Sequence, residues 1–208
     1  PILRAMVFLG INCGFGNTDC ALLPRSAVDL DSGWIEFPRP KTEIPRRIPL
    51  WPETIAALRV ALPLRPQPSD SAGRGLCFLT PRGHVCVRSK LRERKDGQSA
   101  EDEIGPEATV PIDAISGRFR DLLASLDING RRGLGFYTLR HVFETIGGES
   151  KDQVAVDSIM GHVDSSMAAN YRHRISDERL QAVTDTVRAW LFPEKRQKAK
   201  RRRKGGAA

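Results

Sequence analysis

The stretch FYTLRHVFETIGGESKDQVAVDSIMGHVDSSMAANYRHR, residues 136–174, decides the fold, because it reads as three consecutive short helices. The first helix follows Tyr137 and carries one apolar face at the i, i+3, i+4 and i+7 positions, formed by Leu139, Val142, Phe143 and Ile146. Gly147 and Gly148 end this helix. The pattern predicts a helix that packs one side against a core.

The other two helices of this stretch are marked by their ends. Apolar residues predict the second helix over about 151–160, and Gly161 stops it. Asp164 is the predicted N-cap of the third helix. On that third helix Met167 and Tyr171 lie four residues apart, so that they share one face.

Three polar residues, Arg140, His162 and Tyr171, lie where these helices start, stop or turn. An arginine offers a forked cation for a phosphate, a histidine donates to a second oxygen, and a tyrosine hydroxyl is a nucleophile. If they converge, they form a phosphoryl-transfer site without a metal. Taken singly, each has an ordinary explanation: a surface cation, a helix C-terminal cap and a half-buried core residue.

In order and spacing, these residues resemble the catalytic core of the tyrosine recombinase (phage integrase) family. That core has an H-x-L-R-H helix, then L-G-H, then a nucleophilic tyrosine about nine residues on. The matching text here is Tyr137–His141, then Met160–His162, then Tyr171, with Tyr137 standing where the family usually has histidine. The resemblance implies a mainly α fold with a small antiparallel β-sheet, of the α+β class.

The region before residue 52 predicts that small sheet. Val28–Leu30, Trp34–Phe37 and Arg46–Leu50 read as three antiparallel strands, and Lys41 lies in the turn between the second and third. The family's catalytic lysine occupies such a K-T turn, which implies that Lys41 protonates the 5′ leaving oxygen as a general acid. The alternative is an exposed turn lysine.

The first half of the family's site is altered. The family usually has T-G-L-R-x-x-E-L at the start of its second helix, and here Gly16 falls at the arginine and Asp19 at the glutamate. The nearest arginines along the chain are Arg4 and Arg25. A cation that neutralises transition-state charge is worth roughly a thousandfold or more in rate. Gly16 therefore predicts weak catalysis.

The resemblance implies the following chemistry. Tyr171 attacks a DNA phosphate and forms a 3′-phosphotyrosyl link, Arg140 and His162 hold the nonbridging oxygens, and Tyr137 donates a further hydrogen bond. A second strand then reverses the step, so no metal or other cofactor and no small-molecule substrate is required. Such an enzyme carries out site-specific recombination or integration of DNA. Two alternatives are a DNA-binding domain that has lost cleavage and a topoisomerase-like nicking enzyme.

Charge supports an anionic partner. The net charge is +8, and eight basic residues against one acidic residue lie in residues 194–204 alone. Elsewhere basic residues cluster locally and predict contacts with double-stranded DNA, although each cluster alone also fits a solvated face. The predicted DNA-binding residues are Arg39, Arg46, Arg47, Arg82, His141 and Arg172. The resemblance also implies a homo-oligomer on the DNA.

Domain limits and compartment follow from simpler features. Residues 1–192 are the predicted catalytic domain and residues 193–208 a basic, disordered tail, and the family's DNA-clamping domain is expected upstream of Pro1. No apolar run is long enough to span a membrane and no signal peptide is visible. Four cysteines without a C-x-x-C pair predict buried thiols in a reducing cytoplasm. The family resemblance implies that this cytoplasm is prokaryotic and that the protein is nucleoid-associated.

The rest of the chain predicts further elements around this core. Residues 2–11 read as a buried helix, and Asn17 or Thr18 as the cap of a short one. Residues 76–87 read as a strand, a turn and a return, and residues 92–111 as an exposed loop. Two further helices are expected, one over residues 115–126 and one capped at Ser176.

Overall fold

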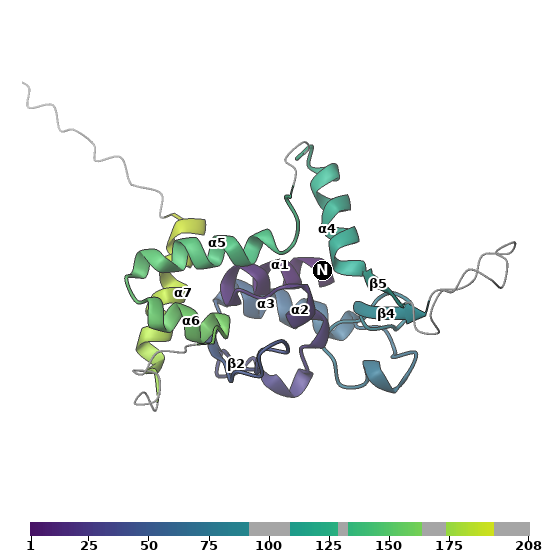
Figure 1. The fold of residues 1–208 in the computed structure, drawn as a ribbon, viewed down its shortest axis with the longest axis horizontal. Coiled ribbons are helices and arrows are strands. Elements are labelled where there is room, and N and C mark those ends of the chain that lie inside the picture. Colours follow the sequence, from purple (N-terminus) through teal and green to yellow (C-terminus); the bar gives the residue numbers. More distant parts are fainter. Residues whose placement is uncertain (92–108, 129–132, 164–173, 194–208) are drawn as a thin grey trace, which may run out of the picture.

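The computed structural model describes residues 1–91, 109–128, 133–163 and 174–193. In these ranges the α-helices are α1 (Ile2–Cys13), α2 (Asn17–Leu22), α3 (Pro52–Ala61), α4 (Ala114–Ser125), α5 (Thr138–Gly147), α6 (Gln153–Met160) and α7 (Asp177–Leu191). The strands are β1 (Val28–Asp29), β2 (Trp34–Glu36), β3 (Arg47–Pro49), β4 (Val87–Leu91) and β5 (Thr109–Asp113). The predicted α+β class is confirmed. Helices α5, α6 and α7 lie at one end of the molecule, and α4 with β4 and β5 at the other (Figure 1).

Helix α1 runs through the middle of the molecule, and α3, α5 and α7 pack around it (Figure 1). Its predicted burial is confirmed, since Ala5 and Leu9 are fully buried. A Cβ at Gly10 would lie 2.8 Å from Leu139, and one at Gly14 would lie 3.0 Å from Phe143. These glycines therefore let the backbone of α1 approach α5 closely. This packing brings the first and last thirds of the chain together.

The predicted three-stranded sheet is present, with order β1-β2-β3 and antiparallel pairing. Ile35 pairs with Ile48, and both side chains are fully buried, which fixes the register of β2 against β3. The turn between these strands, residues 37–46, contains Lys41 as predicted. Pro52 occupies the first turn of α3, as its missing N–H allows.

Buried Asn12 joins three elements at one point. Its side-chain amide donates to the Pro49 carbonyl at 3.0 Å, and its oxygen accepts from the Trp51 backbone at 2.9 Å and the Thr54 hydroxyl at 2.8 Å. All of these groups are inside the protein, so the bonds replace the water they lost. The end of β3 and the start of α3 are thereby fixed to α1.

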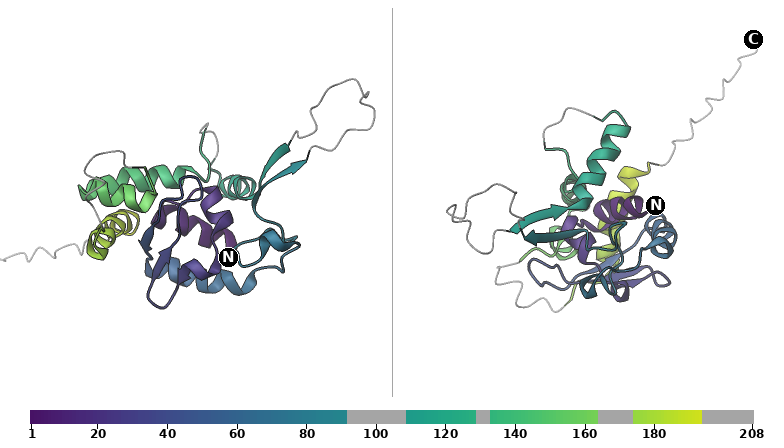
Figure 2. Two further views of the ribbon diagram at one scale, coloured as in Figure 1. Left: turned by 60° about the horizontal axis from the view of Figure 1, so that its bottom comes forward. Right: turned by 90° about the vertical axis from the view of Figure 1, so that its right-hand side faces the viewer.

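The second sheet corrects the sequence interpretation. The turn after Thr80 is present, with Gly83 N–H donating to the Thr80 carbonyl at 2.9 Å, but regular strand begins only at β4. Its partner β5 starts inside the segment predicted as an exposed loop. The strands are separated by residues 92–108, outside the described ranges, and a pairing across so many residues leaves no local sequence signal. The β4–β5 hairpin projects from the body (Figure 2).

The start of α2 also differs from expectation. Gly16 is the N-cap rather than Asn17 or Thr18, and the Asp19 carboxylate accepts from the Gly16 N–H at 2.8 Å. The Asn17 amide instead donates to the Asp113 carboxylate at 2.7 Å, which ties α2 to the start of α4. The helices predicted over 115–126 and after Ser176 are confirmed as α4 and α7.

All four cysteines are buried and free, as predicted. Burial raises the pKa of the Cys77 thiol to about 12 and that of Cys86 to about 11. These thiols are therefore inert side chains of the core. None of the helices in the described ranges is long and apolar enough to cross a membrane.

Candidate active site

Arg140 is a buried arginine at the meeting point of three segments. It projects from the first turn of α5 and is 2% exposed, so the surface-cation interpretation is wrong. Its NH1 group donates to the Gly14 carbonyl at 2.6 Å and its NH2 group to the Met160 carbonyl at 2.8 Å. Burial lowers the pKa of Arg140, and the charge of Arg39 lowers it further. The guanidinium is thus held rigidly between the ends of α1 and α6.

His162 is the second polar group at this point. Gly161 ends α6 in the left-handed conformation (φ 65°), and His162 follows at once. Its Nδ1 lies 3.1 Å from the Asp157 carboxylate and its Nε2 lies 3.2 Å from NH2 of Arg140. A neutral imidazole with its proton on Nδ1 satisfies both contacts, because Nδ1 then donates and Nε2 accepts. Arg140 and His162 therefore converge as the sequence predicted.

The turn between β2 and β3 is attached to the same place. The Gly161 carbonyl accepts from the Thr42 hydroxyl at 3.0 Å and from Arg39 at 3.3 Å. A Cβ at Gly161 would lie 2.9 Å from Cβ of Arg39, so only glycine allows this approach. The turn that carries Lys41 is therefore attached beside His162.

A cleft of about 500 Å³ opens next to these groups. The cleft is lined by Gly16 and the start of α2, by Arg39 and Lys41 from the turn between β2 and β3, and by Tyr137. Tyr137 is 45% exposed and its ring meets that of His141 edge to face at 5.1 Å. The cleft thus gathers Lys41 and Tyr137, two of the predicted catalytic residues, around the position of the missing arginine.

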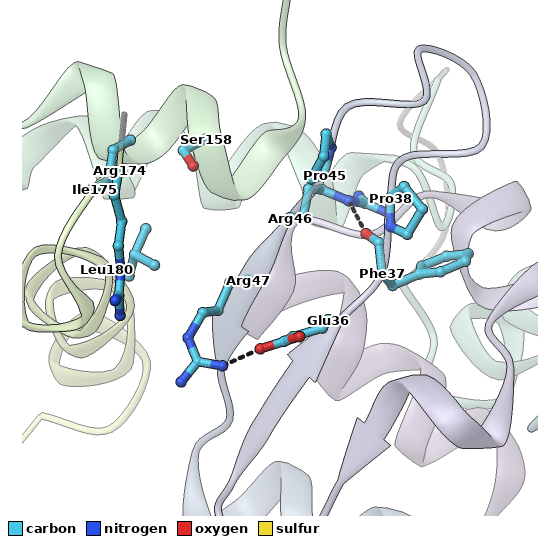
Figure 3. A pocket seen from close by; sticks show the side chains of 10 residues that line it. All are labelled: Glu36, Phe37, Pro38, Pro45, Arg46, Arg47, Ser158, Arg174, Ile175 and Leu180. Carbon is cyan, nitrogen blue, oxygen red and sulfur yellow. Dashed lines mark hydrogen bonds and ion pairs between the residues drawn. The ribbon is translucent and has the colours of Figure 1, made fainter. Parts of the chain in front are cut away.

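Arg46 corrects one predicted DNA contact. It is 3% exposed, pairs with Asp19 at 2.9 Å, and lies between the rings of Phe15 and Phe37 at 4.7 and 5.4 Å. Its Nε donates to the Phe37 carbonyl at 3.0 Å (Figure 3). Burial lowers the pKa of Arg46, although the Asp19 carboxylate opposes that shift. The side chain lies inside the protein, so it offers no surface to DNA.

Arg47, the next residue, lines a different hollow of about 420 Å³. It forms ion pairs with Glu36 and with Asp177, the latter at 2.9 Å, and its guanidinium stacks on Trp34 at 4.1 Å. Figure 3 shows Arg47 directed toward Glu36, with Arg174 on the opposite side of the hollow. Arg47 therefore joins the sheet to the start of α7.

The remaining predicted residues lie elsewhere. His141 and Arg82 are exposed, the first on α5 and the second in the turn after Thr80. Tyr171 and Arg172 lie outside the described residues, as do Asp164, Met167 and the basic segment 194–208. Their predicted roles stay predictions.

Sequence reasoning missed two partners of the site. Asp157 holds His162, which lies five residues further along the chain and beyond the end of α6, so the i, i+4 spacing of a helix gave no signal for the pair. Thr42 fastens the lysine turn, and no local pattern indicates that its hydroxyl meets Gly161 across 119 residues.

The fold is that of tyrosine recombinase structures, so the resemblance stated from the sequence is confirmed at the level of the fold. The Tn1549 transposon integrase in complex with a circular intermediate DNA is 17% identical with a TM-score of 0.54, over 88% of this chain and 57% of that one. The same integrase with transposon right end DNA is 16% identical with a TM-score of 0.55, over 89% of this chain and 58% of that one.

The XerA recombinase is 18% identical to this chain with a TM-score of 0.54, over 93% of this chain and 59% of that one. The chain therefore spans less than two thirds of each of these proteins. No protein-family model and no curated protein sequence matches it.

Proposed function

We propose that this chain is the catalytic part of a tyrosine recombinase, which cuts and rejoins DNA through a 3′-phosphotyrosyl link. The observation that supports this most is the convergence of Arg140 and His162, with Nε2 3.2 Å from the guanidinium, beside a cleft that contains Lys41. Arg140 contributes positive charge there, and His162 and Lys41 offer a donor and a proton to a phosphodiester.

In the proposed reaction the hydroxyl oxygen of Tyr171 attacks the scissile phosphorus and gives its proton to the solvent. The bond from phosphorus to the 5′ oxygen breaks, and Lys41 supplies the proton that this leaving oxygen takes. Arg140 fixes the floor of the site. When Nε2 of His162 takes up a proton in place of its contact with Arg140, the imidazolium donates from Nε2 to a nonbridging oxygen, while Nδ1–H still donates to Asp157. The 5′ hydroxyl of another strand then attacks the phosphotyrosyl link and reverses the step. The DNA is rejoined without an external energy source, because the link keeps the energy of the broken phosphodiester.

Double-stranded DNA is the proposed partner. The Tn1549 integrase structures contain DNA, as their names state, and the basic segment 194–204 of this chain suits a phosphate backbone. We further propose that residues 1–192 act as the catalytic domain of a homo-oligomer on DNA, next to a DNA-clamping domain, in a prokaryotic cytoplasm.

A covalent-trapping assay tests this function. The full-length protein is mixed with a labelled pool of duplexes of randomised sequence. Each duplex carries a nick, so that cleavage close to the nick releases a short fragment with the 5′ hydroxyl, and its loss prevents the reverse reaction. The wild type is expected to form an adduct that survives denaturing electrophoresis, and sequencing the trapped DNA gives the site. Tyr171→Phe removes one oxygen and should bind the same DNA without forming the adduct.

A DNA-binding domain without cleavage is the second candidate, and Gly16 favours it because no side chain projects there. Binding of duplex DNA with no adduct from any pool would support that candidate against the first. An adduct with Tyr171→Phe would contradict the assignment of the nucleophile. Relaxation of supercoiled DNA without strand exchange would identify a nicking enzyme instead.

A further inference from the structure

The donors of Arg140 are largely used up inside the protein. Two backbone carbonyls and Nε2 of His162 occupy its two terminal nitrogens, and the side chain is 2% exposed. A guanidinium has five N–H donors in a fixed fork, so contacts of this kind leave it little freedom to wrap an incoming anion. Arg140 is placed to shape the site and to contribute charge from behind it.

Arg39 is the arginine that faces the cleft. It lines the cleft together with Lys41, Gly16 and Tyr137. Its backbone is fixed, because its carbonyl accepts from the N–H groups of Thr42 and Glu43 at 3.1 and 2.7 Å. Its guanidinium makes one long contact, to the Gly161 carbonyl at 3.3 Å, within the described residues. A charge-assisted bond to a phosphate oxygen is shorter and stronger than such a contact, so a phosphate can redirect it.

The local charge also favours an anion at this position. Arg39 and Lys41 both line the cleft, and the charge of Arg39 also lowers the pKa of the buried Arg140. The carboxylate of Asp19, which also lines the cleft, is neutralised by its ion pair with Arg46 at 2.9 Å. Arg46 itself is held between two aromatic rings and does not line the cleft. An anion between Arg39 and Lys41 would relieve the repulsion that the protein leaves in place.

We propose that Arg39 is a catalytic residue of this chain: its guanidinium binds a nonbridging oxygen of the scissile phosphate and supplies the cation that Gly16 does not. This proposal rests on the function proposed above. Arg4 and Arg25, the arginines nearest to Gly16 in the sequence, do not supply it. Neither residue lines the cleft. Arg4 lies over Phe8 on α1, and the Arg25 backbone N–H donates to the Gly75 carbonyl at 2.7 Å.

The test compares Arg39→Gln with Arg59→Gln in the full-length protein. Arg59 lies on the exposed face of α3, so its substitution makes the same change in charge away from the cleft. The single-turnover rate of adduct formation should fall about a hundredfold for Arg39→Gln, since one donor to transition-state charge is worth that much, and stay unchanged for Arg59→Gln. Arg39→Lys should form the adduct about tenfold faster than Arg39→Gln, because lysine keeps the positive charge but lacks the bidentate geometry of the guanidinium.

A methylphosphonate at the scissile position separates a catalytic role from a structural one. It replaces a charged nonbridging oxygen with a neutral methyl group, so the wild type and Arg39→Gln should react with it at rates within a few-fold of each other. A penalty on this neutral substrate as large as that on phosphate would mean that Arg39 only holds Gly161, and would overturn the proposal.

Salt dependence gives an answer that needs no cleavage. The slope of log K against log salt for duplex binding is negative, and loss of one phosphate contact should make it less steep by about 0.9 in Arg39→Gln. The slope should stay unchanged in Arg59→Gln. An unchanged slope in both variants overturns the proposal, even where the wild type forms no adduct. If the wild type forms no adduct but the salt dependence of Arg39→Gln is less steep, the proposed enzymatic function is wrong and Arg39 is a phosphate ligand.

Discussion

Arg46 and Asp19 form a buried ion pair, with NH2 of the guanidinium 2.9 Å from the carboxylate. The pair joins the start of β3 to α2, and the second Asp19 oxygen holds the Gly16 N–H at 2.8 Å. The sequence assigned these two residues to separate tasks, Arg46 to DNA and Asp19 to a family motif. In the structure they are one unit that shapes the wall of the cleft.

Breaking this pair should destabilise the protein strongly. Asp19→Asn leaves the Arg46 charge buried without its partner, so the free energy of unfolding should fall by about 3–5 kcal/mol. Urea unfolding followed by circular dichroism measures it. The double variant Asp19→Asn with Arg46→Met should lose less than Asp19→Asn alone, because it removes the stranded charge. Equal stability of Asp19→Asn and the wild type would show that the pair does not hold α2.

Gly16→Arg should rescue the Arg39→Gln variant. Gly16 has an ordinary extended backbone (φ −90°), so a side chain is allowed there. A Cβ would lie 3.0 Å from the exposed Tyr137 ring, which can shift. The added guanidinium enters the same cleft, so adduct formation should rise at least about tenfold over Arg39→Gln alone. Gly16→Gln is the matched control, and an equal rise with glutamine would exclude charge as the cause.

The basic segment should add affinity for DNA without sequence preference. Each phosphate contact from residues 195–204 releases a counterion, so deleting them should flatten the salt dependence of duplex binding. Fluorescence anisotropy on a specific and a scrambled duplex, at several salt concentrations, measures both slopes. An unchanged slope would mean that the segment does not touch DNA, and a loss confined to the specific duplex would mean that it reads sequence.

Helix α7 should lose its attachment in acid. Arg188 pairs with Glu53 on α3, and Arg179 pairs with Asp152 at the start of α6, so these ion pairs join α7 to both helices. The guanidinium groups lower the pKa of Glu53 and of Asp152. A carboxyl group with a lowered folded pKa stabilises the protein above its unfolded value, about 4, and that contribution disappears as pH falls through the folded value.

Urea unfolding at several pH values between 3 and 7 tests the attachment of α7. The wild type should lose stability below about pH 4, and the double variant Glu53→Gln with Asp152→Asn should be less stable at pH 7 and change less with acid. Parallel pH profiles for the two proteins would show that these pairs contribute nothing.

The sequence by itself determined the local elements and the order of the site. The apolar spacing of α5, the glycines that end α5 and α6, and the position of Lys41 in a strand turn are all local signals, carried by residues a few positions apart. The family resemblance rests on the same short-range spacing. Neighbouring residues fix backbone angles directly, so such features need no knowledge of the rest of the chain.

Only the tertiary structure decided which cations meet. Arg140 donates to Gly14 across 126 residues, and Arg39 reaches Gly161 across 122. The close approach of α1 to α5 buries Arg140, and the ion pair with Asp19 withdraws Arg46 from the surface. Arg39 lines the cleft, Arg46 lies in the core and Arg47 pairs with α7. Nothing in the neighbouring sequence distinguishes these three arginines. Their roles differ because burial and charge pairing depend on segments that meet only when the chain has folded.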